Sequence, residues 1–142
     1  MIENITRDGQ LLAIILSHNF QKPGIHFFTD NRFSQQLAYM SHPAGKKIEP
    51  HVHNKIERQV HYTQEVLFIR KGRLRVDFYD TRHIYIESRV LEAGDVILLA
   101  SGGHGFEVLE PVEMIEVKQG PYFGDADKTR FAPVAPNQII IK

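Results

Sequence analysis

Hydrophobic residues occur in short runs that are separated by turn signals along most of the chain. The clearest example is RLRVDFYD (residues 73–80), in which Leu74, Val76 and Phe78 alternate with charged neighbours. Because successive side chains of a strand point to opposite faces, this pattern predicts a half-buried β-strand. Similar runs predict strands over residues 11–16, 34–42, 65–70, 84–91, 96–100, 106–110 and 113–118. Many short strands with regular turns predict an all-β sandwich or barrel.

The C-terminal residues differ from the rest of the chain. In APVAPNQIIIK (residues 132–142), Pro133 and Pro136 stop regular structure, and the β-prone run Ile139–Ile141 has nothing local to pair with. We expect such an end strand to add to a sheet edge, either its own or a partner's. Together with the strand at residues 11–16 it offers sheet edges at which two copies of the chain could exchange or add strands. The sequence therefore predicts a homodimer.

Length and composition exclude several classes of protein. A chain of 142 residues fits one domain that can bury its own core. The 17 basic and 17 acidic residues cancel, and no basic run exceeds two residues, so nothing suggests nucleic-acid binding. The longest aliphatic run, residues 11–16, is too short for a membrane span and lacks the flanks of a signal peptide. We expect a cytoplasmic protein that binds neither nucleic acid nor membrane.

Candidate metal ligands are confined to nitrogen and oxygen, because the chain has no cysteine. His51 and His53 follow Pro50, and an extended backbone there would place both imidazoles on one face. Glu65 and His104 could join them from later strands. Three imidazoles and one carboxylate suit a divalent ion such as Fe, Mn, Co, Ni or Zn, and leave two octahedral positions open. The alternative for the histidine pair is two solvent-facing loop residues.

The spacing of these residues resembles a known signature. Gly45 is followed after five residues by His51-x-His53, Glu65 is followed after six by Gly72, and Gly94 and His104 come downstream. This resembles the two-part motif of the cupin superfamily, over residues 37–118. The resemblance implies one domain with a double-stranded β-helix (jelly-roll) barrel at about residues 37–118, N-terminal strands in residues 1–36 and an extension over residues 119–142. It also implies that His51, His53, Glu65 and His104 are the metal ligands.

The first motif departs from the family pattern in its spacing. Eleven residues separate His53 from Glu65, where the family has three or four. Glu57 stands at the shorter spacing, but the residue seven positions later is Gln64 and not glycine. We expect Glu65 to be the ligand, because loops accept insertions more readily than barrel strands do.

The inserted residues 54–64 leave the predicted site and return to it, so we expect them at its rim. Glu57 and His61 are then candidates for catalysis, and Arg58 and Tyr62 for substrate binding. The alternative is a solvated surface loop.

A second group of residues that could line the predicted site follows from the last predicted barrel strand onward. Lys118 could form an acid–base pair with Glu116 if both point inward, and Tyr122 could contact the substrate. If Ile115 and Val117 face the core instead, that pair points to solvent. Asp127 and the preceding Asp125 are expected to form a turn.

Three functions are compatible with these features. The first is a metal-dependent isomerase or epimerase acting on a small polar metabolite, sugar-like or carboxylate. The second is an iron-dependent oxygenase, and the third is a non-catalytic module that binds a sugar or an acid. The titratable residues at the predicted rim favour the first, because an oxygenase is expected to surround its metal with a drier wall. A role in carbohydrate metabolism is suggested by analogy alone.

Overall fold

The computed structural model describes residues 1–142 and shows two compact units. The first, which we call the sheet unit, combines residues 1–20 with residues 63–142. The second comprises residues 21–62. Both are built from strands, and the only helical segments are two short 3-10 turns, Gly124–Asp127 and Pro136–Gln138. The prediction of an all-β protein is therefore confirmed.

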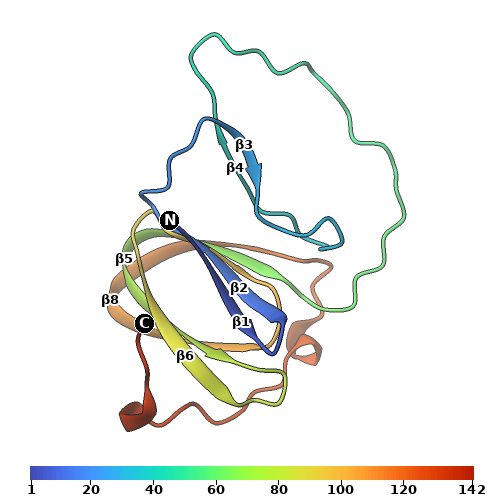
Figure 1. Ribbon diagram of the computed structural model, residues 1–142. Helices are drawn as coiled ribbons and strands as arrows, with labels where there is room; N and C mark the ends of the chain where they lie inside the picture. The colour runs from blue at the N-terminus through green and yellow to red at the C-terminus, as the bar shows by residue number, and fades with distance from the viewer. The chain divides into compact units, whose positions relative to one another are not determined.

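The sheet unit is a six-stranded antiparallel sheet that curls into a half-barrel (Figure 1). Its order is β1-β2-β7-β5-β6, and β8 pairs along the other edge of β5. The strands are β1 (Ile2–Arg7), β2 (Gln10–Leu16), β5 (Glu65–Tyr79), β6 (Tyr85–Glu92), β7 (Val96–Leu99) and β8 (Gly103–Lys118).

The long strands β5 and β8 each unite two predicted strands. The alternation of the sequence breaks at Gly72 in β5 and at Pro111 in β8, and the structure bends both strands there without ending them. The ladder between them shifts register three times, between Ile69 and Leu74. Such bulges increase local twist and bend a sheet. Gly72 has a φ of +84°, and a Cβ at this position would overlap the carbonyl oxygen of Pro111.

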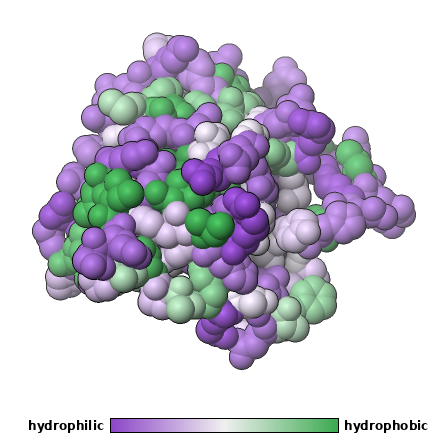
Figure 2. Space-filling model, turned by 60° about the horizontal axis from the view of Figure 1, so that its bottom comes forward, coloured by the Kyte–Doolittle hydropathy of each residue, from purple (hydrophilic) through white to green (hydrophobic).

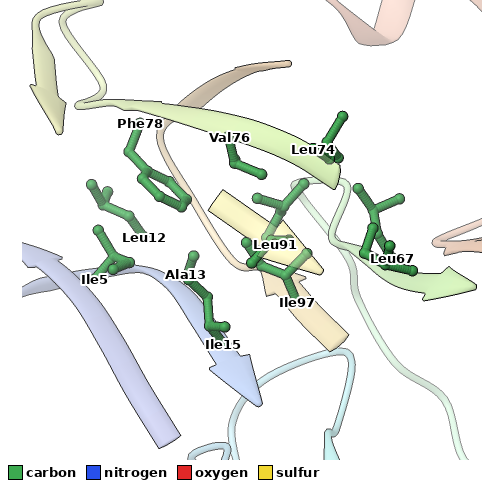
Figure 3. Close-up of a cluster of buried hydrophobic side chains, with 12 residues drawn as sticks. Ile5, Leu12, Ala13, Ile15, Leu67, Leu74, Val76, Phe78, Leu91 and Ile97 are labelled. Carbon is green, nitrogen blue, oxygen red and sulfur yellow. The ribbon is translucent and has the colours of Figure 1, made fainter. Parts of the chain in front are cut away.

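The core lies inside the curl of this sheet. Figure 3 shows aliphatic side chains from opposite parts of the sheet pointing toward one another, with Phe78 among them. Burying each large side chain of this kind stabilises the fold by about 1.5–3 kcal/mol. The cluster consists of Ile5, Leu12, Ala13, Ile15, Leu67, Ile69, Leu74, Val76, Phe78, Leu91, Ile97 and Leu99. Five of these residues belong to β5, so this strand supplies more of the core than any other.

The N-terminal hairpin corrects one expectation. The segment at residues 11–16 forms most of β2, but it is not a sheet edge, because β1 pairs along one side of it and β7 along the other. The hairpin turns at Asp8 and Gly9, which have φ values of 51° and 77°. Two successive residues with positive φ are typical of the type I′ turn that Asp-Gly favours. The sequence contains this turn signal. The strand before the turn, IENITR, was not predicted because it is too polar to stand out as a hydrophobic run.

The C-terminal residues pair with their own chain. Ile141 forms a parallel bridge with Ser88 of β6. The Ser88 N–H donates to the Ile140 carbonyl at 2.7 Å, and the Lys142 N–H donates to the Ser88 carbonyl at 3.1 Å. The C-terminal segment therefore adds to a sheet edge of its own chain.

Apolar side chains remain exposed on the surface, where Figure 2 shows them among hydrophilic residues on one face. In β8 they are Phe106, Val108, Leu109, Met114, Ile115 and Val117. The outer edge of β8 has no strand partner within the sheet unit. Its glutamates and Pro111 are features that keep edge strands from pairing with other molecules.

The unit of residues 21–62 contains one antiparallel hairpin, β3 (Gly24–Phe27) with β4 (Ala38–Ser41). β4 lies within the strand predicted at residues 34–42, whereas β3 was not predicted. The connection is ordered by Gln36, whose side-chain amide donates to the carbonyls of Asp30 at 2.9 Å and Phe33 at 3.0 Å. Residues 42–62 form neither helix nor strand.

Gly72→Ala tests the bend. An added Cβ would meet Pro111, and alanine would have to keep a left-handed backbone that is costly for any residue with a Cβ. We therefore expect the free energy of unfolding, measured in urea, to fall by several kcal/mol. Gly9→Ala is the matched control, because Gly9 has a similar φ of +77° but open space around a Cβ. The control should lose about 1–2 kcal/mol. Equal losses in the two variants would show that the approach to Pro111 does not constrain the fold.

Candidate functional site

Glu65 and His104 lie close together at the end of the sheet unit's interior. Glu65 begins β5 and His104 is the second residue of β8. In the ladder Glu65 faces Lys118 and His104 faces Phe78, so the two residues belong to opposite ends of the paired strands. The bend brings these ends toward each other, and Nε2 of His104 lies 3.7 Å from Oε2 of Glu65.

The surroundings shift the pKa of both residues. Glu65 is buried, and this burial, with the neighbouring Glu116 carboxylate, raises its pKa above the usual 4.5, although Lys118 and Lys128 partly oppose the shift. Burial lowers the pKa of His104 below 6.5, and Lys128 lowers it further against the opposing Glu116. His104 is therefore a neutral imidazole at pH 7, able to accept a proton or bind a metal.

Glu116 and Lys118 point to the inner face of the sheet. Glu116 lies opposite the buried Leu67 and Lys118 lies opposite Glu65, and residues paired across an antiparallel ladder share a face. The intervening Val117 is 57% exposed. Of the two orientations left open by the sequence, the structure therefore shows the inward one for the charged pair.

Lys118 is a proton donor rather than a base in this arrangement. Its Nζ lies 3.3 Å from Oε2 of Glu116. The hydrogen bond and the charge of Glu116 raise the pKa of Lys118, so the ammonium group keeps its proton at neutral pH.

A cavity of about 160 Å³ lies next to Lys118. Its lining includes Lys118, Tyr122, Asp127 and Lys128, together with Thr63 just before β5. The Thr63 hydroxyl donates to Oδ1 of Asp127 at 2.5 Å and joins the segment before β5 to the 3-10 turn Gly124–Asp127. The expected turn at Asp125 and Asp127 is thus a 3-10 helix. Sequence reasoning missed Lys128, because no motif or strand pattern marks it.

His51 and His53 lie side by side in the unit of residues 21–62. Their ring centroids are 5.4 Å apart, and both side chains are exposed. Nδ1 of His51 donates to the Glu49 carbonyl at 2.9 Å, which leaves Nε2 free to bind a ligand. The structure thus shows the four predicted ligands as two pairs, one in each unit.

The predicted rim residues Glu57, Arg58, His61 and Tyr62 belong to the same exposed stretch as the two histidines. The structure gives them no strand or helix, and none of them lines the cavity next to Lys118. In neither unit do three or more His, Asp or Glu side chains gather into a group that could hold a metal ion.

The pH dependence of stability reports on Glu65. In metal-free protein the folded state keeps the Glu65 proton to a higher pH than the unfolded state does, so this residue costs stability as the pH rises from 4.5 through its folded pKa. Glu65→Gln removes that cost. We expect the variant to gain stability relative to the wild type as the pH rises above 4.5, measured by urea unfolding. Glu110→Gln, at a side chain that is 55% exposed, is the control and should show no such gain. A flat difference for Glu65→Gln would contradict the raised pKa.

Comparison with known proteins identifies no relative. No family model matches the chain, and neither the curated proteins nor the solved structures contain a match. None of the helical segments is long and apolar enough to cross a membrane. The interpretation of the site therefore depends on its residues and their geometry.

Proposed function

We propose that this chain is a small metal-binding protein of the cupin type, in which a divalent ion bound to Glu65 and His104 supports isomerase- or epimerase-type proton transfer on a small polar metabolite. One observation carries the proposal: a buried carboxylate and a neutral imidazole lie 3.7 Å apart inside the curl of the sheet. Two strand ends that are distant along the ladder provide them.

The donor set of this pair fits a divalent ion. Donor atoms that each bind one ion at about 2.1 Å lie at most about 4.2 Å apart, and the distance of 3.7 Å is within that limit. One carboxylate oxygen and one imidazole nitrogen suit Fe, Mn, Co, Ni or Zn. The spacing of the sequence adds His51 and His53 as further ligands, and this remains a prediction.

The residues around the pair suit proton transfer. A divalent ion bound there would polarise a carbonyl or hydroxyl of the substrate. Lys118 carries a proton that it can donate, and its positive charge stabilises negative charge on the substrate. Glu116, next to Lys118, can accept a proton. These charged groups favour a hydroxylated or anionic substrate over an apolar one. His61 and Glu57 remain predicted rim groups, with Arg58 and Tyr62 as predicted substrate contacts.

The metal content of the purified protein tests the proposal. We expect near-stoichiometric metal in the wild type by elemental mass spectrometry, and a loss of more than about tenfold in Glu65→Ala and His104→Ala, because each removes a ligand. Glu57→Ala is the matched control and should keep its metal. His51→Ala tests the ligands predicted from spacing.

Three results would change the interpretation. Loss of metal in Glu57→Ala but not in Glu65→Ala would exchange the roles of the two glutamates. Stoichiometric iron would favour the oxygenase. The absence of metal in every sample, even after reconstitution, would contradict the proposal and favour a binding module.

A further inference from the structure

The cavity at the end of β8 has two lysines and one aspartate, Asp127, in its lining. Lys118 lines it from the end of β8, and Lys128 lines it from the segment after the 3-10 turn. At about 160 Å³ the cavity is far larger than the roughly 10–15 Å³ that one water molecule requires. It can therefore take a ligand of several heavy atoms next to the two lysines.

Lys128 is the cation that is free to bind such a ligand. It forms no ion pair, whereas Lys118 is engaged by Glu116 at 3.3 Å. The acidic residues nearest to it in sequence have other partners, since Asp127 accepts the Thr63 hydroxyl at 2.5 Å and Asp125 lies 3.3 Å from Arg130. An ammonium group without a carboxylate partner on a concave surface favours an anion.

Lys128 also lies near the proposed metal ligands. Its positive charge lowers the pKa of Glu65 and of His104. An anion that binds Lys128 would thus occupy the same region as the Glu65–His104 pair. The exposed Tyr122 hydroxyl, on the same cavity wall, can donate a further hydrogen bond.

We propose that Lys128 and Lys118 form an anion subsite in this cavity, and that the substrate is a small carboxylate rather than a neutral sugar. The assignment of the substrate rests on the function proposed above, whereas the subsite itself does not. Lys128 holds the carboxylate, and the rest of the molecule extends toward Glu65 and His104.

Calorimetric titration with malonate tests this subsite. It is run on protein as purified and on metal-free protein, so that chelation by malonate is separated from binding in the cavity. We expect Lys128→Gln to weaken malonate binding by about tenfold or more in both forms, because a charge-assisted hydrogen bond is lost. Lys71→Gln is the matched control, since it removes the same charge from β5 outside the cavity lining, and it should bind like the wild type. Inorganic phosphate and the neutral polyol xylitol are the comparison probes, and both should bind more weakly than malonate.

The outcomes separate the two proposals. Weaker malonate binding in Lys128→Gln with unchanged metal content supports the subsite. Equal binding by Lys128→Gln and the wild type overturns it, and so does tighter binding of xylitol than of malonate. Tighter binding of phosphate would retain an anion subsite but overturn the carboxylate assignment. Anion binding that depends on Lys128, in a protein that takes up no metal even after reconstitution, would support the subsite and contradict the proposed function.

Discussion

The close approach of Gly72 to the Pro111 carbonyl is the constraint on which the rest of the sheet unit depends. Only a residue without a Cβ fits there, and its left-handed backbone also favours glycine. The bend at this point lets one pair of long strands line both walls of the half-barrel. The inward side chains of β5 then pack against those of β2 and β7 in the buried cluster.

The same bend determines the chemistry of the site. Glu65 and His104 belong to opposite ends of the β5–β8 ladder, and a flat sheet would keep them far apart. Once they meet inside the curl, burial disfavours the charged form of each and moves their pKa values toward one another. Burying such groups costs stability, and positions that retain them despite the cost are candidates for function. Glu116, Lys118 and Lys128 then surround the pair with charges of both signs.

Much of the fold could be predicted from the sequence, because strands with one buried face alternate in polarity. The strand around Leu74, Val76 and Phe78 is the clearest case. The union of two predicted strands across Gly72 could not be predicted, because the alternation breaks at a bend as it does at a strand end. The inward orientation of Glu116 depended on the register between β5 and β8, which three bulges determine and which leaves no trace in the pattern of the sequence.

The site was predictable to a smaller extent. Glu65 and His104 were selected by their spacing and by resemblance to a family motif, and the structure shows that they are neighbours. Lys128 had no signal, because it reaches the cavity through a 3-10 turn and a hydrogen bond from Thr63 to Asp127 that involve residues distant in sequence. Sites that depend on such tertiary contacts are visible only once the chain is folded.

Nitrogen NMR of the His104 side chain, in protein labelled with ¹⁵N-histidine, tests most directly whether Glu65 and His104 bind one ion. The His104 signals are assigned by their absence in His104→Gln. Addition of one equivalent of Zn²⁺ to metal-free protein should shift the Nε2 resonance in the wild type, and this shift should be lost in Glu65→Ala but kept in Glu57→Ala. A His104 resonance that Zn²⁺ leaves unchanged, or a shift that persists without Glu65, would contradict a shared metal site.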